Sequence, residues 1–256
     1  MKFIDLSMTL ENGFPSDPPS AMAKIEYQSH EDTIPAMLFL CGAKTKEEIP
    51  DGLGYANEQL TASSHAHTHM DAPWHYYPTT EGGKKAFGID EVPLDWCYGP
   101  GVVLDFSDKP NGYSVTAADV EAKFKEMNYE LKPGVIVLIR SGAEHAWGTD
   151  AYFDSGCGMS GEATEWLCRR GMRVCGTDAW GWDVPFKYCA QRFAEDHDTS
   201  KIWSGHLMGK KYAYCHMEKL TNLAALPSRG FTVCAFPCKV KGASAGWVRC
   251  VALLEE

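Results

Sequence analysis

Residues 135–139 form an unbroken apolar run, Val-Ile-Val-Leu-Ile, that directly follows Pro133-Gly134. A run of this length, mostly β-branched and bounded by turn residues, predicts a strand that is buried on both faces. Such strands occur in parallel sheets whose faces are covered by helices. The run is therefore typical of an α/β fold.

The segments around this run alternate between strand and helix patterns. Thr116 is the expected N-cap of one helix, and Ser160 is the expected N-cap of a second helix that runs through Arg170 and is stopped by Gly171. The predicted strands are residues 101–106, 135–139, 174–178, 231–236 and 247–254. This order predicts right-handed crossovers. Since no linker interrupts the chain, we expect a single α/β domain over residues 1–256, with a mixed, partly parallel sheet.

The first hundred residues are rich in proline and glycine. The segment 13–19 reads Gly-Phe-Pro-Ser-Asp-Pro-Pro, and further prolines follow at intervals up to Pro93. This punctuation predicts irregular loops between short strands, with little room for long helices.

The charge balance bears on the kind of partner. Lysine and arginine total 24, aspartate and glutamate total 34, and no run of five basic residues occurs. Nucleic-acid binding needs a basic face that displaces counterions, so we expect no nucleic-acid partner. No apolar stretch approaches the roughly 20 residues of a membrane span, and the N-terminus shows no export signal. We therefore expect no membrane partner and a cytoplasmic location.

Ten cysteines are present, but none forms a C-x-x-C pair. Without an export signal, reduced thiols used as small hydrophobic residues are the favoured interpretation.

Cys215 directly precedes His216, and this pair resembles a thiol nucleophile beside its base. Adjacent residues rarely point at one another, so we interpret the two as a buried pair without a catalytic role. No G-x-S-x-G motif supports a serine hydrolase.

The segment 65–75 reads His-Ala-His-Thr-His-Met-Asp-Ala-Pro-Trp-His and holds four of the nine histidines. Neutral imidazole is a common ligand of zinc, manganese and iron, and a carboxylate adds negative charge. Alternate residues of a strand share one face, so four side chains are expected to project together: His65, His67, His69 and Asp71. The pattern predicts a metal centre, with His75 facing it after Pro73 bends the chain.

This segment resembles the H-x-G-T-H-x-D-x-P-x-H signature of the cyclase-like metal-dependent hydrolases, the family of bacterial kynurenine formamidase and isatin hydrolase. Other segments are similar to the family in the same order along the chain: 3–7, 14–17, 158–160, 176–178, 206–208 and 217–223. His206 and Glu218 stand twelve residues apart, as in the family. The resemblance covers most of the chain and implies the family's swivelling β/β/α architecture.

The resemblance also implies roles for individual residues. The implied ligands of one or two divalent ions, zinc or manganese, are His65, His69, Asp71, His206 and Glu218. Asp71 would bridge two ions where both are present, and His75 would donate and accept the proton. Family relatives are oligomers, so the resemblance implies a homodimer or homotetramer.

One departure from the family concerns the shape of the pocket. The family has glycine where this chain has His67, whose imidazole could become a further ligand, contact substrate or point away. Phe14 matches an aromatic residue that contacts substrate in the family's formamidases. Trp74, next to His75, is another expected contact. Rings near a metal suit a planar aromatic or heterocyclic small-molecule substrate.

The expected activity is hydrolysis of a small amide or cyclic amide, either an aryl formamide or an isatin-like imide or lactam. The bond cleaved would be a carbon–nitrogen bond other than a peptide bond. A divalent ion lowers the pKa of water towards about 7, and His75 would serve as general acid and base. The alternatives are a metal-assisted lactone hydrolase, a lyase-type cyclase and a metal-binding protein without catalysis.

Overall fold

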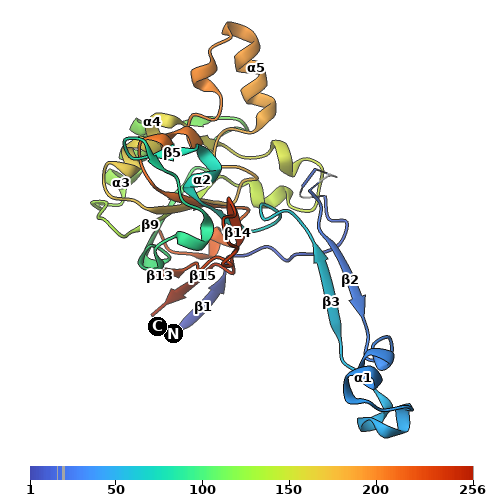
Figure 1. Cartoon of the computed structure of the whole chain (residues 1–256). Helices are drawn as coiled ribbons and strands as arrows, with labels where there is room; N and C mark the ends of the chain where they lie inside the picture. Colours follow the sequence, from blue (N-terminus) through green and yellow to red (C-terminus); the bar gives the residue numbers. More distant parts are fainter. Residues whose placement is uncertain (16, 19–20, 256) are drawn as a thin grey trace.

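The computed structural model describes residues 1–15, 17–18 and 21–255, so Ser16 of the N-terminal motif lies outside the described residues. A nine-stranded mixed sheet has the order β1-β15-β13-β7-β9-β11-β12-β4-β14 (Figure 1). Its strands are β1 (Lys2–Asp5), β4 (His69–Asp71), β7 (Tyr98–Asp105), β9 (Ile136–Arg140), β11 (Val174–Thr177), β12 (Cys215–Glu218), β13 (Arg229–Cys234), β14 (Ala245–Trp247) and β15 (Val251–Leu254).

The four central strands, β7, β9, β11 and β12, run parallel, whereas the strands on both sides pair antiparallel. Side chains of β9 alternate between two cores. Ile136 and Leu138 pack into one core, and Val137 and Ile139 pack into the other. The apolar run thus forms a strand buried on both faces, and the predicted α/β class with a mixed, partly parallel sheet is confirmed.

Helices α3 (Ala117–Glu126) and α4 (Gly161–Cys168) cover the core that contains Val137. At α3, the Thr116 hydroxyl accepts the N–H of Asp119 (3.1 Å), and the Asp119 carboxylate accepts the N–H of Thr116 (2.9 Å). At α4, the Ser160 hydroxyl accepts the N–H of Ala163 (3.1 Å). Both helices begin where the sequence predicts because these caps satisfy N–H groups that have no partner inside the helix.

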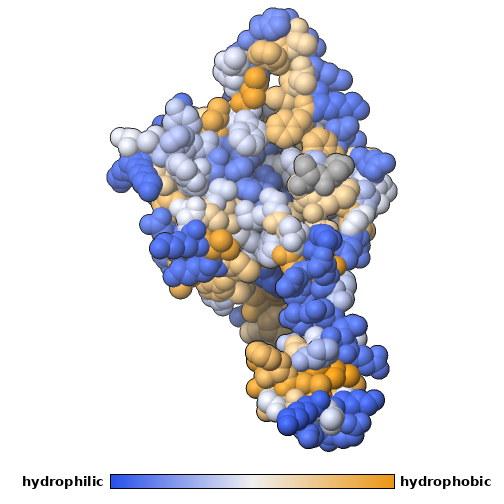
Figure 2. Space-filling view, turned by 45° about the vertical axis from the view of Figure 1, so that its right-hand side comes forward, coloured by the Kyte–Doolittle hydropathy of each residue, from blue (hydrophilic) through white to orange (hydrophobic). Residues whose placement is uncertain are grey.

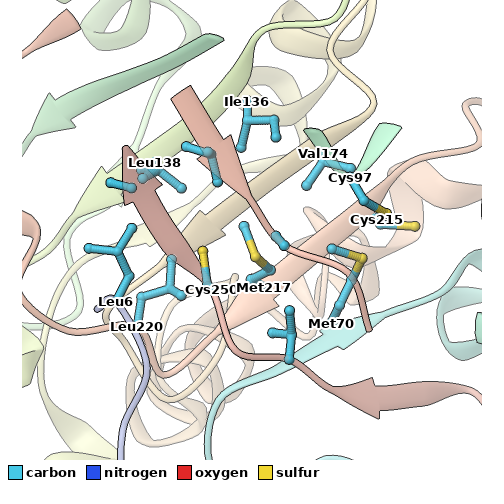
Figure 3. Packing of buried hydrophobic residues seen from close by; sticks show 14 of the residues in the cluster. Leu6, Met70, Cys97, Ile136, Leu138, Val174, Cys215, Met217, Leu220 and Cys250 are labelled. Carbon is cyan, nitrogen blue, oxygen red and sulfur yellow. The ribbon is translucent and has the colours of Figure 1, made fainter. Parts of the chain in front are cut away.

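The opposite core lies within the curl of the sheet (Figure 3). Buried side chains meet there from strands and loops far apart in sequence, among them Leu6, Met70, Leu138, Met217, Leu220 and Cys250. All ten cysteines are free, and most are buried. Their expected use as small hydrophobic residues is confirmed.

The strand predicted over residues 247–254 is interrupted, because Trp247 is the last residue of β14 and β15 begins only at Val251. β14 pairs with β4 at one edge of the sheet, and β15 pairs with β1 and β13 near the other edge. Between them, the Cys250 N–H donates to the Ser7 hydroxyl (2.8 Å). The single-strand prediction is wrong because an apolar pattern carries no information about which strand will supply hydrogen-bond partners.

Residues 24–61 leave the body of the molecule as an arm (Figure 1). In this arm, β2 (Lys24–Gln28) and β3 (Asn57–Thr61) pair antiparallel, and α1 (Ile34–Cys41) lies at the tip. The short strands agree with the proline-rich sequence, but α1 is a helix that the sequence analysis does not predict.

The remaining elements are α2 (Pro73–Tyr76), β5 (Thr79–Thr80), β6 (Lys84–Lys85), β8 (Ser114–Val115), β10 (Gly158–Met159) and α5 (Phe186–Asp196). Among the described residues, no helix is long and apolar enough to cross a membrane.

We predict that Leu138→Ala lowers the free energy of unfolding by about 2–5 kcal/mol, because it leaves a cavity at a fully buried position. Leu94→Ala is the matched control, since Leu94 is 70% exposed, and its expected effect is within about 0.5 kcal/mol. Urea unfolding measures the free energy of unfolding of both variants. Equal effects of the two substitutions would contradict the described core.

Candidate metal centre

The pairing of β4 with β12 builds the middle of the site. The two strands are antiparallel, with Asp71 opposite His216 and His69 opposite Glu218. Met70 and Met217 point into the core of Figure 3. Because strand side chains alternate between faces, the four polar residues lie together on the other face of the sheet.

Two buried carboxylates and two imidazoles are in direct contact there. Nε2 of His69 lies 3.2 Å from Asp71 Oδ1 and 3.5 Å from Glu218 Oε2. Nε2 of His216 lies 3.1 Å from Asp71 Oδ2 and 3.1 Å from Glu218 Oε1. Each carboxylate therefore contacts both imidazoles.

Three further histidines reach these carboxylates from other segments. Nδ1 of His65, in the turn before β4, lies 2.9 Å from Asp71 Oδ1. Nε2 of His75, on α2, lies 3.7 Å from Asp71 Oδ2. Nε2 of His206, in the 3-10 helix η8 (His206–Lys210), lies 3.6 Å from Glu218 Oε1. The structure thus brings together all six residues for which the resemblance implies ligand or proton-transfer roles.

Hydrogen bonds around the cluster orient its side chains. Nδ1 of His206 donates to Asp183 Oδ2 (2.6 Å), and Nδ1 of His69 donates to the carbonyl of His67 (2.7 Å). With Nδ1 protonated, Nε2 of each ring carries the lone pair that faces the carboxylates. The N–H of Trp182 donates to Glu218 Oε1 (2.9 Å), which holds that carboxylate in place.

His216 is the member of the cluster that sequence analysis missed. Its ring stacks on Tyr76 (4.9 Å between ring centroids) and on Trp182 (5.5 Å), and the Tyr76 hydroxyl accepts the backbone N–H of His216 (2.9 Å). Residues 215 and 216 are both buried, as the sequence analysis expects, but only Cys215 lies in the apolar core. His216 belongs to the cluster of possible metal ligands, which that interpretation does not include. The sequence spacing could have identified His216, because it stands two residues before Glu218 and a strand places both side chains on one face.

The protein's own charges shift the pKa values of these groups strongly. Burial alone would lower the pKa of His216, but hydrogen bonds with Asp71 and Glu218 raise it to about 9. Burial would raise the pKa of Glu218, as would the charge of Asp71, yet His216 and His69 lower it to about 2. Burial is also the main reason that the pKa of His75 falls to about 4. Both carboxylates are therefore ionised at neutral pH, and the His75 imidazole is neutral.

The donor atoms of the cluster fit a divalent cation. Within the described residues, the buried His69 Nε2 and Asp71 Oδ1 have no hydrogen-bond partner, which is costly unless a cation lies between them. Two groups bring ligand atoms within 4.8 Å of one another: Asp71, His206, His216 and Glu218, and also His65, Asp71 and His75. Imidazole and carboxylate suit zinc, manganese or iron. Asp71 belongs to both groups, which agrees with the bridging role that the resemblance implies.

His67 does not share a face with these ligands. β4 begins only at His69, and His67 has φ +53°, so the expectation of one extended strand over residues 65–71 is wrong. A left-handed backbone favours glycine, which explains why glycine suits this position in the family. The His67 ring packs edge-on against Trp147 (5.6 Å), with Nδ1 3.8 Å from Asp17 Oδ2.

A buried ion pair fixes the turn that carries His65. The ammonium of Lys219, directly after Glu218, donates to Asp17 Oδ1 and to the carbonyl of His65 (2.8 Å). Nε1 of Trp180 donates to the same carboxylate oxygen of Asp17 (3.2 Å). Asp17 of the N-terminal segment therefore holds the His65 turn against β12 through the buried side chain of Lys219.

A cavity of about 160 Å³ opens beside the cluster. Its lining residues include His65, His75, His206, Glu218, Phe153, Trp180, Phe186 and Trp203. The last four form an aromatic wall, and Trp203 stacks on the His206 ring (4.3 Å, 11°). The wall shows where a flat apolar group would fit next to the ligands.

The three residues expected to contact substrate lie outside this lining. Phe14 packs against Trp147 (5.1 Å), Trp74 is 43% exposed on α2, and the His67 ring packs against Trp147 as well. None of the three is among the described residues that line the cavity. Their contact with substrate stays a prediction. Of the aromatic wall, the sequence points to Trp180 and Phe186 as rings that could meet substrate, with core packing as the equal alternative, but not to Phe153 or Trp203.

The family described as putative cyclase matches residues 4–184. Among solved structures, isatin hydrolase A from Labrenzia aggregata, bound to benzyl benzoate, is similar with TM-score 0.77 and 22% identity, covering 100% of this chain and 94% of that chain. Isatin hydrolase A from Ralstonia solanacearum is similar with TM-score 0.73 and 24% identity, covering 99% of this chain and 92% of that chain. A predicted metal-dependent hydrolase from Bacillus stearothermophilus is similar with TM-score 0.63 and 16% identity, covering 98% of this chain and 97% of that chain. No curated protein matches. These likenesses confirm the expected fold.

We predict that Asp71→Ala and His216→Ala each lower the metal content of the purified protein, because both remove a donor from the centre of the cluster. Elemental analysis after exposure to zinc or manganese measures this. His145→Ala is the control, since His145 is exposed and outside the cluster. Full occupancy in Asp71→Ala would show that the cluster does not bind the ion.

A second prediction concerns the carboxylate that orients His206. Asp183→Asn should weaken metal affinity about 10–100-fold, the usual effect of losing the group that orients a ligand histidine. Competition with a chelator measures the affinity. Asp108→Asn, at an exposed position, should leave it unchanged. If both variants bind metal as the wild type does, Asp183 has no positioning role.

Proposed function

Because the chain belongs to the putative cyclase family, we propose that it is a metal-dependent hydrolase that cleaves the carbon–nitrogen bond of a small amide or cyclic amide. One observation carries the proposal: five histidines and two buried carboxylates converge beside a cavity with an aromatic wall. A site with only a structural ion would have no need of an adjoining cavity.

The residues that would hold one or two ions are His65, His69, Asp71, His206, His216 and Glu218. Zinc and manganese both accept this combination of imidazole and carboxylate. When bound, such an ion lowers the pKa of water and polarises a carbonyl group. Asp183, the His67 carbonyl and the Trp182 N–H keep the donor atoms oriented, so little rearrangement is needed during the reaction.

His75 is the residue placed to move the proton. It lines the cavity, its ring lies 4.2 Å from that of His65 between centroids, and its Nε2 faces Asp71. Its imidazole can accept the proton of the attacking water and pass it to the leaving nitrogen. No covalent bond between protein and substrate is required, which fits the buried position of Cys215 and the absence of a serine-hydrolase motif from the sequence.

The aromatic wall supports a planar aromatic or heterocyclic substrate. Trp180, Phe186 and Trp203 offer ring faces and edges at the mouth of a site whose floor is strongly polar. A substrate with a flat apolar ring fused or joined to an amide would match both parts. The likeness to two isatin hydrolases favours a cyclic amide over an aryl formamide.

We predict that His75→Ala keeps its metal and loses about 10²–10⁴-fold in kcat, the usual contribution of a general acid and base. The assay uses isatin, an N-formyl aryl amine and a lactone, with elemental analysis of each preparation. His145→Ala should retain both metal and activity. Loss of metal in His75→Ala would show that His75 is a ligand instead.

The same assay separates the alternatives. Product masses that include added water indicate hydrolysis, and products without added water would indicate a lyase-type cyclase. Turnover of the lactone alone would indicate a lactone hydrolase. A metal-loaded protein that turns over nothing in the panel would favour a binding protein without catalysis.

Removal of the ion is a further test. Dialysis against a chelator should abolish hydrolysis, and added zinc or manganese should restore it, because the chain's residues alone do not supply an activated water. The metal that restores the higher rate at equal occupancy identifies the better cofactor. Unchanged hydrolysis by the chelated protein would overturn the metal requirement.

A further inference from the structure

Lys219 is a buried cation that has no role in the proposed hydrolysis. It directly follows Glu218, the last residue of β12, and is 1% exposed. Glu218 faces the ligand cluster, so an extended residue after it would face the core on the other side of the sheet. Lys219 instead has φ +59°, a left-handed backbone, and it lines the same cavity as Glu218. Strained backbone of this kind is concentrated at functional sites.

Hydrogen bonds from two other segments hold this unfavourable conformation. The N–H of Lys219 donates to the carbonyl of Ala179, just after β11 (2.9 Å). The carbonyl of Lys219 accepts the hydroxyl of Thr68, just before β4. The strands that build the site therefore also fix the position of Lys219.

The ammonium of Lys219 has one more hydrogen to donate than its neighbours accept. An ammonium carries three N–H donors. Two of them bond to Asp17 Oδ1 and to the carbonyl of His65 (2.8 Å), and the described residues offer no third acceptor. A buried donor is costly when it is unpaired, so a molecule in the cavity that offers an acceptor would gain affinity from this N–H.

Stability alone does not explain an ion pair at this position. The side chains of Lys219 and Asp17 are each 2% exposed, and the desolvation of two charges offsets much of their attraction. A well-packed apolar pair of similar volume is often as stable. What the ion pair adds is an ammonium 5.0 Å from the ring centroid of Trp180, which belongs to the aromatic wall.

The cavity brings this ammonium and the ligand cluster into one small space. Its volume is about 160 Å³, and its lining includes Lys219, Glu218 and Phe186, the first residue of α5. Figure 2 shows the surface hollowed below the lobe that carries α5, with hydrophilic residues in the depth of the hollow. A flat molecule bound against the aromatic wall would therefore meet the cluster at one point and the ammonium at another.

We propose that Lys219 is a specificity-determining residue that donates its third N–H to a second carbonyl oxygen on the ring of the substrate. The inference rests on the proposed function, in which the ligand cluster faces the carbonyl that is attacked. Asp17 already balances the charge of the ammonium, so a neutral carbonyl suits this position better than a carboxylate. The substrate class is then a cyclic amide with two ring carbonyls. An aryl formamide whose only oxygen is the formyl oxygen would leave the donor unpaired.

The test compares the binding of isatin and oxindole, which have the same fused rings and the same amide but differ by one ring carbonyl. Stopped-flow quenching of tryptophan fluorescence measures both Kd values on the metal-loaded protein before turnover. The ratio of Kd for oxindole to Kd for isatin is expected to fall about 10–100-fold in Lys219→Met, the usual effect of losing a hydrogen bond from a charged group. A purely structural role would weaken both ligands alike, and an unchanged ratio would overturn the proposal.

Asp17→Asn is the matched control, because it breaks the same ion pair and keeps the ammonium. It should retain most of the preference for isatin. An equal loss of preference in Asp17→Asn and Lys219→Met would assign the effect to the ion pair and overturn the proposal. If Lys219→Met fails to fold because Asp17 is left unpaired, the double variant Asp17→Asn/Lys219→Met has neither charge and should show the same fall in the ratio.

Turnover separates this inference from the proposed function. A wild type that hydrolyses neither isatin nor an N-formyl aryl amine would refute the proposed function, but a preference for isatin that depends on Lys219 would still support recognition of a second carbonyl. A wild type that hydrolyses isatin, with a preference that Lys219→Met leaves unchanged, would overturn the inference alone.

Discussion

The antiparallel register between β4 and β12 is the constraint on which the site depends. It places His69 and Asp71 opposite Glu218 and His216, and the alternation of strand side chains turns all four to one face. The residues between them, such as Met70 and Met217, anchor the same strands in the core. A slip of one residue would send the carboxylates into that core and the methionines into the site.

Burial of two carboxylates explains why so many imidazoles surround them. An isolated ionised carboxylate is very unfavourable away from water, so the protein must supply positive charge or a cation. Five histidines approach Asp71 and Glu218, while Lys219 is occupied with Asp17 and the His65 carbonyl. The aromatic rings that stack on His206 and His216 then keep these imidazoles in one orientation.

The sequence was most informative where short-range chemistry decides the outcome. Helix caps at Thr116 and Ser160 and the apolar run of β9 were predictable because each follows from neighbouring residues. The ligand set implied by the resemblance was brought together by the fold, but His216 was overlooked because its partner strand was not known. The turn at His67, the division of residues 247–254 and the arm depend on tertiary pairing, which the periodicity of a single segment does not encode.

The ligands come from segments that begin at His65 and end at Glu218, and β4, which carries two of them, is only three residues long. Such a short strand has little cohesion of its own, and the unfolded chain has no preformed site for an ion. A cation that binds only the native state therefore stabilises the whole sheet by mass action. The supply of the ion would then set how much of this chain survives proteolysis, as well as how much of it is active.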